Sequence, residues 1–320
     1  MVSVGYTLLG EQVGPKQLIA DAIRAERAGF DYAVVSDHFS PRLNEQGHAP
    51  YMWAVLGAVA HVTERIALMS MVTCPTRRYH PAIVAQKAAT VALLSDGRFT
   101  LGLGAGERLN EHVVGDWPDV ARRHDMLIEA LEIIKPLLAG ATVTHLGEYY
   151  QVTDARLYDR PERGVPLALA ASGPESAQLA ADFADGLITS QPLAEVINLF
   201  ASAVGPDRPV YGQIPLCYGR DEAACRRTAY EQWRWGGLGW KVLAELPDTQ
   251  SFAQVTEYMR EDDVARLVSC GPDLDRHVEA VREYVRAGFS HVSLVQVGGA
   301  GQADFLDWAE RDLLPALRDV

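Results

Sequence analysis

Eight short runs of β-forming residues, each followed by a longer run with helical periodicity, divide this chain of 320 residues. The runs are mostly continuous apolar stretches, which is typical of parallel strands that are covered on both faces. We expect the strands at residues 4–9, 32–36, 66–73, 99–104, 167–171, 187–189, 210–216 and 291–297. Eight strand–helix units can close on themselves, so the pattern predicts an α/β fold of the (β/α)8 TIM-barrel type rather than an open sheet.

Two segments interrupt this alternation. Residues 142–158 alternate around a turn at Gly147 and predict a hairpin inserted before the fifth strand. Residues 230–265 contain three of the six tryptophans and predict a helical excursion between the seventh and eighth strands. No Ser-rich or Pro-rich linker divides the chain, so we expect residues 1–320 to form a single barrel domain with these insertions.

Three of the predicted helices have clear limits in the sequence. A helix over residues 17–28 ends before Gly29, a residue that readily takes the left-handed conformation at a helix end. Pro81 suits the first turn of a second helix. An apolar stripe from Leu127 to Leu138 predicts a third helix that ends at Gly140.

The charge balance excludes some partners. The chain has 42 acidic and 29 basic residues, so its formal net charge is −13, whereas nucleic acids and anionic membranes attract basic patches. The four cysteines show no metal-binding spacing, the first residues lack a secretory signal pattern, and no apolar run approaches the ~20 residues of a membrane helix. We therefore expect a cytoplasmic protein with a small-molecule substrate and with no nucleic acid, membrane or metal partner.

In a barrel of this kind the active site lies at the carboxyl ends of the strands. The residues that end or follow the apolar runs are therefore the candidates for chemistry. They are Asp37 and His38 after the second strand, Met71, Val72 and Thr73 at the end of the third, Glu107 and Asn110 after the fourth, Ser172 and Gly173 after the fifth, Thr189 and Ser190 after the sixth, and Gln296 in the eighth.

The candidates also have purely structural interpretations. Asp37 can cap a helix beside a core histidine, and Glu107 can be a solvated acid in the first turn of a helix. The segment 172–175 fits either phosphate binding by free backbone N–H groups or an ordinary capping turn. The glycines of segment 102–106 lack the spacing of a dinucleotide fingerprint and suggest close approach of a ligand ring. Motifs of zinc proteases, serine hydrolases and P-loop nucleotide hydrolases are absent from the sequence.

Several longer motifs resemble one family. They are VVSDHF at 34–39, GHAP at 47–50, TCPTRRYHPAIVAQKAAT at 73–90, GRFTLGLGAGERLNE at 97–111, GEYY at 147–150 and VPLALAASGPESAQLAADFADGLITS at 165–190. Together they resemble the coenzyme F420-dependent glucose-6-phosphate dehydrogenases and their close relatives in the luciferase-like superfamily. The likeness covers almost the whole chain, is weaker over residues 191–262 and recovers at 270–292.

The resemblance implies a role for each candidate. Asp37 corresponds to an aspartate that contacts the deazaflavin ring system, and His38 to a histidine that acts as general base or stabilises the substrate alkoxide. Glu107 corresponds to a glutamate that exchanges a proton with the ring. The bond between Met71 and Val72 corresponds to a non-prolyl cis peptide that supports the ring. The other residues implied to hold the coenzyme are Ala105, Asn110, Ala170, Ala171, Ser172, Gly173, Thr189 and Ser190.

The sugar-phosphate site of those relatives is not matched here. Arg42 stands where they have a tryptophan, Pro192 stands where they have a lysine, and their other phosphate-binding residues have no clear counterpart. A phosphate dianion needs charged partners, so we do not expect glucose 6-phosphate to be the substrate. Arg42 is either a new contact for an anion or a solvated loop arginine.

The sequence thus predicts an F420-dependent oxidoreductase that transfers a hydride between the deazaflavin C5 and a small alcohol or carbonyl compound. His38 and Glu107 are the predicted catalytic residues. One alternative is an FMN-dependent monooxygenase of the same superfamily, and another is a coenzyme-binding protein with little catalysis. By analogy with the family we expect a homodimer.

Overall fold

Eight parallel strands form a closed barrel in the computed structural model, which describes residues 2–318 and residue 320. β8 pairs with β9, and β11 pairs with β1, so the barrel closes on itself and the predicted (β/α)8 TIM barrel is confirmed. The barrel strands are β1 (Ser3–Leu8), β2 (Tyr32–Val35), β3 (Ala67–Ser70), β4 (Phe99–Leu103), β7 (Leu167–Ala170), β8 (Gly186–Ile188), β9 (Val210–Cys217) and β11 (His291–Gln296).

Each predicted strand is present, but β3 ends earlier than we expected. The chain leaves the sheet after Ser70, and Thr73 pairs with Leu103 only as an isolated bridge. The peptide bond between Met71 and Val72 in this irregular stretch is cis, at the position that the resemblance implied. A further short strand, β10 (Ser269–Cys270), extends the pairing of β9 outside the barrel.

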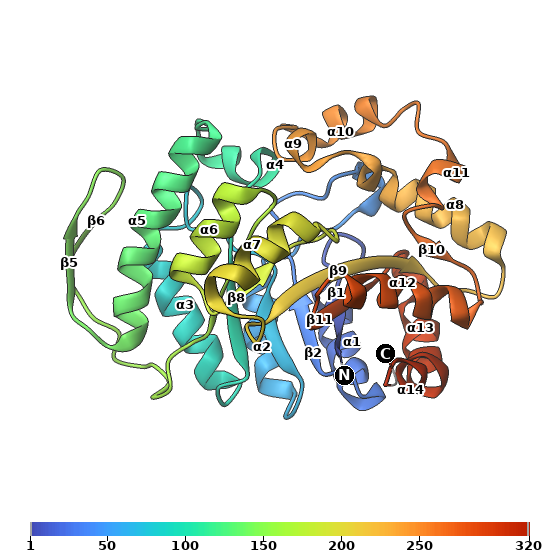
Figure 1. The fold of residues 1–320 in the computed structure, drawn as a ribbon, viewed down its shortest axis with the longest axis horizontal. Coiled ribbons are helices and arrows are strands. Elements are labelled where there is room, and N and C mark those ends of the chain that lie inside the picture. The colour runs from blue at the N-terminus through green and yellow to red at the C-terminus, as the bar shows by residue number, and fades with distance from the viewer. Residues whose placement is uncertain (1, 319) are drawn as a thin grey trace.

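Helices surround the barrel, as Figure 1 shows. α1 begins with Pro15 in its first turn and ends before Gly29, whose φ of 96° is left-handed. α5 ends in the same way before Gly140. The main outer helices are α1 (Pro15–Ala28), α2 (Met52–Val62), α3 (Pro81–Leu94), α5 (Val120–Ala139), α6 (Pro174–Phe183), α7 (Ala194–Val204), α12 (Leu274–Arg286), α13 (Gln302–Trp308) and α14 (Leu314–Leu317).

Alternate residues of several strands belong to two different cores, because successive side chains of a strand point to opposite faces. In β2, Ala33 and Val35 pack towards the helices, whereas Tyr32 and Val34 pack inside the barrel. The inner core also contains Met69, Ala168 and Ile188 and is bordered by partly buried side chains beyond the strand ends. The barrel is therefore filled, and a ligand can bind only at its mouth.

The glycines of β4 serve this inner packing. A Cβ atom at Gly102 would lie 2.0 Å from the backbone oxygen of Ser70, and one at Gly104 would lie 2.9 Å from Cγ2 of Val72. Both glycines are thus required by contacts within the protein. At Gly102 and Gly104 this corrects our interpretation that the glycines of this segment allow the close approach of a ligand ring.

Two inserted segments lie outside the barrel. The hairpin of β5 (Val143–Leu146) and β6 (Gln151–Ala155) runs along α5 at the left edge of Figure 1. The helical excursion occupies residues 222–264 and contains α8 (Glu222–Trp233), α9 (Trp240–Leu243), α10 (Thr249–Val255) and α11 (Glu261–Val264). It begins eight residues before the predicted 230 because Asp221 caps α8, accepting hydrogen bonds from the backbone of Ala223 and Ala224.

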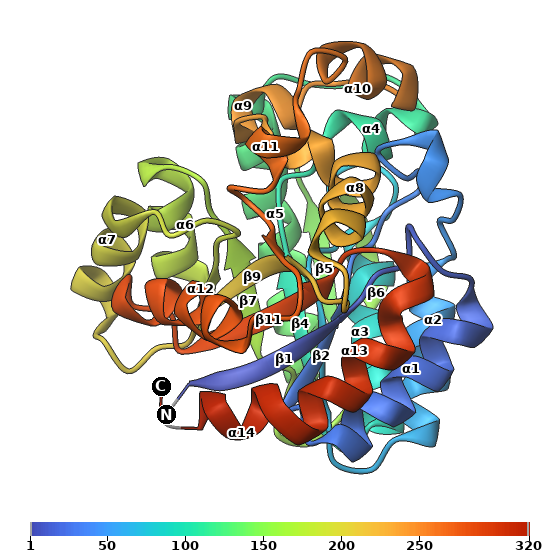
Figure 2. The same ribbon diagram turned by 90° about the vertical axis from the view of Figure 1, so that its right-hand side faces the viewer.

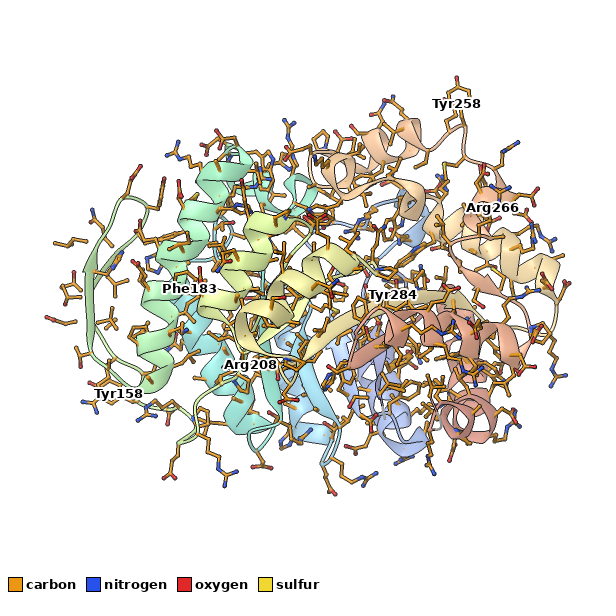
Figure 3. The ribbon with its side chains drawn as sticks, in the orientation of Figure 1. Tyr158, Phe183, Arg208, Tyr258, Arg266 and Tyr284 are labelled. Carbon is orange, nitrogen blue, oxygen red and sulfur yellow. The ribbon has the colours of Figure 1, made fainter. Side chains whose placement is uncertain are left out.

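The helical excursion lies at one end of the barrel, beside α4 (Arg108–Glu111), as Figure 2 shows. Tyr258 of the excursion and Arg266, just after it, point outward in Figure 3. This is the end at which the barrel strands finish, so the excursion borders the expected active site. None of the helices within residues 2–318 is long and apolar enough to span a membrane.

Candidate active site

His38, which follows β2, lies between two carboxylates at the barrel mouth. Its Nδ1 is hydrogen bonded to Oε1 of Glu11, from the loop after β1, and its Nε2 lies 3.1 Å from Oε1 of Glu107, which follows β4. All three side chains are largely buried. With an acceptor at each ring nitrogen, the imidazole donates from both sides and carries a positive charge.

The pKa of His38 reflects this arrangement. Burial by itself lowers it, but the carboxylates of Glu11 and Glu107 outweigh burial and raise the pKa of His38 to about 9. The histidine is therefore charged at neutral pH in the ligand-free protein. It can give a proton to an oxygen atom placed beside it, and it must lose that proton before it can act as a base.

Glu107 is held by donors from three directions. Nη2 of Arg42 lies 2.8 Å from Oε2 and 3.1 Å from Oε1, and Nδ2 of Asn110 donates to Oε1 at 2.6 Å. Burial alone raises the pKa of this carboxyl group, but Arg42 and His38 more than reverse the effect and lower it to about 2. Glu107 is thus a carboxylate that accepts hydrogen bonds and can accept a proton.

Asn110 connects Glu107 to the loop that carries His38. Its Oδ1 accepts hydrogen bonds from the backbone nitrogens of Phe39 and Ser40, at 2.7 and 3.1 Å. The amide is buried, and both of its ends are engaged within the protein. The structure therefore gives Asn110 an organising role, and the direct contact with the coenzyme that the resemblance implied stays a prediction.

Asp37 is the centre of a buried hydrogen-bond network. Oδ2 accepts from Trp53 Nε1 at 3.1 Å and Thr73 Oγ1 at 2.9 Å, and Oδ1 accepts from Tyr79 at 3.0 Å and Arg78 at 3.3 Å. Only 1% of the side chain is exposed. Asp37 thus fixes the end of β2 next to His38, and its predicted contact with the deazaflavin is untested.

Apolar side chains border the mouth beside the His38–Glu107 pair. Met71, Val72 and Ala170 lie at the upper edge of the inner barrel core and remain partly exposed, as does Ala105 after β4. A planar aromatic ring needs such a surface, because small and flexible apolar groups allow close face contact. We call Met71, Val72, Ala105 and Ala170 the apolar floor. Together with the donors His38 and Arg42, this floor fits a flavin-like cofactor at the barrel mouth.

The segment after β7 leads into α6, and its backbone N–H groups are hydrogen bonded within the protein. Gly173 is the residue before the first turn, and a Cβ atom at Gly173 would meet nothing within 4 Å. Ala171 is buried, and the backbone nitrogens of Ser172 and Gly173 bond the Ser176 hydroxyl at 3.1 and 3.2 Å. The open space before α6 leaves room for a phosphate group, for which the N–H groups in the first turn of α6 would be the donors. The predicted contact of Ser172 and Gly173 with a phosphate stays a prediction.

The end of β8 completes the rim. Thr189 is buried, with its backbone nitrogen 3.0 Å from the carbonyl oxygen of Tyr211, whereas Ser190 is exposed. The carbonyl oxygen of Ser190 accepts a hydrogen bond at 3.0 Å from Tyr284 of α12, which Figure 3 labels. Thr189 and Ser190 thus follow β8, which pairs with β7, the strand before α6.

Two residues of this site were not recognised in the sequence. Glu11 follows β1 and met the same criterion as the other candidates, a polar residue after an apolar strand. Arg42 was left between a solvated loop arginine and an anion contact. It is in fact 8% exposed, paired with Glu107 and stacked over Trp235 with its Cζ 4.3 Å from the ring centre.

The fold and the site define a class. The sequence model of the luciferase-like monooxygenase family matches residues 3–291, and the chain belongs to this family, as the resemblance implied. The chain is 36% identical to an F420-dependent glucose-6-phosphate dehydrogenase of Amycolatopsis mediterranei, with 99% of each chain covered. It is 38% identical to a protein of the same name from Beutenbergia cavernae, over 99% of this chain and 98% of the other.

Solved structures give the same picture. An F420-dependent secondary alcohol dehydrogenase in complex with an F420-acetone adduct is similar with a TM-score of 0.90 and 28% identity, over 99% of both chains. The F420-dependent tetrahydromethanopterin reductase of Methanopyrus kandleri has a TM-score of 0.76 at 21% identity, a likeness of fold alone.

Proposed function

We propose that this chain is an F420-dependent oxidoreductase acting on a small, uncharged alcohol or carbonyl compound. The observation that carries the proposal is the contact of His38 with Glu107, a proton donor beside a proton acceptor, next to an apolar floor at the barrel mouth. Relatives across the whole length are named F420-dependent dehydrogenases, and the similar solved structure is a secondary alcohol dehydrogenase.

Coenzyme F420, when bound, supplies a deazaflavin ring that accepts or gives a hydride at one carbon. The apolar floor described above would hold the ring. The turn of Ala171, Ser172 and Gly173, with Thr189 and Ser190 beside it, would border the phosphate-bearing part, and the N–H groups in the first turn of α6 would hold it. Asp37 and Asn110 would fix the loops on which the catalytic side chains stand.

His38 and Glu107 divide the proton transfers. Glu11 engages Nδ1 of His38, so Nε2 is the nitrogen that serves the substrate oxygen, as donor to an alkoxide or as acceptor from a hydroxyl. Glu107 accepts a proton from the cofactor ring or returns one to it. The two groups lie 3.1 Å apart, so a proton can also pass between them directly.

An uncharged substrate agrees with the charges of the mouth. Arg42 already pairs with Glu107, and Arg78 already pairs with Glu111 and Asp37. Pro192 follows β8 at the position where the glucose-6-phosphate enzymes carry a lysine. A sugar phosphate would have to compete with these carboxylates for its cationic partners.

Equilibrium binding to the purified protein tests the cofactor, with tryptophan fluorescence as the signal and FMN as the comparison. We expect F420 to bind and FMN to bind far more weakly. F420-loaded enzyme is then screened with secondary alcohols, the corresponding ketones and glucose 6-phosphate, following the deazaflavin absorbance. Preference for FMN, or turnover of glucose 6-phosphate alone, would contradict the proposal.

A homodimer through the outer faces of α2 and α3 is part of the same proposal. Lys87 is the only Asp, Glu, Arg or Lys residue within these two helices, although the whole chain carries a net charge of −13. Val62, Ile83, Leu93 and Leu94 of these helices are 42–49% exposed. A surface with so few charged residues on an acidic protein favours contact with a second copy. Sedimentation of Leu93→Glu against wild type tests it, and a dimeric variant would contradict this interface.

The four cysteines favour a cytoplasmic location. All four are free and buried, and thiols persist in reducing compartments. Detection of the protein in fractionated cells tests this expectation, and recovery outside the cytoplasm would overturn it.

A further inference from the structure

The helical excursion has its own hydrophobic core, and that core reaches the loops of the active site. Trp233, Trp235 and Phe252 of the excursion pack with Leu9, Leu43 and Leu109 of the barrel loops. These leucines stand next to Glu11, Arg42 and Glu107 in the sequence, within two residues in every case. The excursion therefore shares a hydrophobic core with the loops that carry the site residues.

Polar contacts join the same two regions. Nη2 of Arg234 bonds Oε1 of Glu45 at 3.0 Å, and Nε2 of Gln46 reaches the carbonyl oxygen of Gln232 at 3.4 Å. Oε1 of Gln46 in turn accepts a hydrogen bond from the backbone nitrogen of Arg42 at 2.9 Å. The loop of residues 42–46 is thus held along the segment 232–235.

Arg42 connects the helical excursion to Glu107, because its side chain contacts both. Its guanidinium stacks on Trp235, which itself packs against Trp233 with ring centres 4.2 Å apart, and both bonds to Glu107 come from Nη2. An arginine fork on an aromatic face loses little freedom on pairing, and lysine cannot reproduce it.

The charges around Glu107 depend on Arg42. The buried set consists of Glu11, His38, Arg42 and Glu107, two negative and two positive side chains, with the amide of Asn110 as a neutral donor. Asp37, Glu111 and Arg78 form a neighbouring ion cluster, and the Cys74 thiol lies near both groups. Without Arg42 the inner set would carry an excess negative charge in a buried place, which raises the pKa of its acids.

We propose that Arg42 is a positioning residue of this site, which couples the helical excursion through Trp235 to Glu107 and holds that carboxylate in one orientation and negatively charged. The inference rests on the proposed function, since Glu107 matters for catalysis only if it exchanges a proton there. It adds to that function a role for the helical excursion of residues 222–264.

The first test needs no cofactor. In protein labelled with ¹³C in histidine, NMR follows the titration of His38, to which Arg42 contributes repulsion. Arg42→Met removes that repulsion, so we expect the His38 midpoint to rise by roughly half a pH unit or more. Arg42→Lys keeps the charge and should restore the wild-type midpoint. Trp235→Leu keeps every charge and should leave the midpoint in place.

The second test uses the F420-loaded enzyme. Arg42→Met should lower kcat by roughly tenfold or more with little change in F420 binding, because the carboxylate is no longer held. Trp235→Leu should also lower kcat, since the platform beneath the guanidinium is lost. Arg226→Met, a surface arginine of the same excursion paired with Asp262, is the matched control and should leave kcat and the titration unchanged.

Each outcome has a clear meaning. A wild-type midpoint together with a wild-type kcat in Arg42→Met would overturn the inference. If thermal melting shows that this variant does not fold, Arg42→Lys and Trp235→Leu decide, and wild-type kcat in both would overturn it as well. Failure of the wild-type protein to bind F420 would instead defeat the proposed function, and the cofactor-free titration would still report whether Arg42 acts on this site.

Discussion

Glu11 and His38 form a hydrogen bond across neighbouring strands, since the first follows β1 and the second follows β2. The second oxygen of Glu11, Oε2, is buried and has no hydrogen-bond partner within the described residues. A buried carboxylate held in this way is stabilised chiefly by its histidine, and burial is outweighed so that the pKa of Glu11 is lowered. The pair therefore fixes both the orientation and the charge of His38.

Replacing Glu11 by Gln should weaken this control. The amide removes one of the two carboxylates that raise the pKa of His38, so we expect the NMR midpoint to fall from about 9 towards the ordinary value. We also expect kcat to fall roughly tenfold or more, because the imidazole is no longer oriented. An unchanged His38 titration in Glu11→Gln would show that the bond has no electrostatic role.

Stability should depend on pH through His38. The folded pKa of about 9 lies above the ordinary 6.5, so the folded protein retains a proton that the unfolded chain loses. The stabilisation is complete below about pH 6.5 and is lost as the pH rises to about 9. Denaturant unfolding of wild type and His38→Asn across this window checks the expectation. The difference in unfolding free energy between them should shrink with rising pH, and a constant difference would contradict the assignment.

Asp37→Ala should be strongly destabilising. Four donors, from Trp53, Thr73, Arg78 and Tyr79, would lose their shared acceptor in a buried place. We expect the free energy of unfolding to fall by about 3 kcal/mol or more. Asp116→Ala is the control, because Asp116 is mostly exposed in its pair with Arg77 and should matter little. Similar unfolding midpoints for the two variants would refute the central role of Asp37.

Gly102→Ala should disturb the barrel itself. The added Cβ would lie 2.0 Å from the backbone oxygen of Ser70, so β3 and β4 would have to separate. We expect a loss of about 2 kcal/mol or more, seen as a lower Tm in thermal melting followed by circular dichroism. Gly239→Ala serves as the comparison, because nothing lies within 4 Å of a Cβ there. Equal melting temperatures for the two variants would show that the packing argument is wrong.

The sequence predicted the barrel well because each strand is a local apolar run whose position does not depend on distant partners. His38 and Glu107 became candidates for a related reason, since both stand in the segment that follows a strand, and the family resemblance implied their catalytic roles. The pairing of Arg42 with Trp235 could not be predicted, because the two residues are far apart in the chain and meet only when the helical excursion packs on the barrel. The four hydrogen bonds to Asp37 could not be predicted either, because their donors come from two segments, α2 and the loop between β3 and α3.

The early end of β3 has a similar explanation. Residues 66–73 form a continuous run of strand-forming residues, and nothing in that run marks the point at which the chain leaves the sheet. That point is set by the neighbouring strand, where Gly102 and Gly104 allow close contact. The contacts of Gly102 with Ser70 and of Gly104 with Val72 join distant parts of the chain, so the residues of the run alone could not predict where β3 ends.

The shared core of the helical excursion has a consequence for protein engineering. Loops of TIM barrels are commonly exchanged as independent modules to alter selectivity. Residues 222–264 are not such a module here, because Leu9, Leu43 and Leu109 belong to three other loops and complete the packing beneath Trp233 and Trp235. Moving residues 222–264 alone into another barrel would separate Trp233 and Trp235 from these three leucines. The leucines would then be uncovered in this protein, and the tryptophans would lack matching partners in the other. A functional graft would have to carry four loops together.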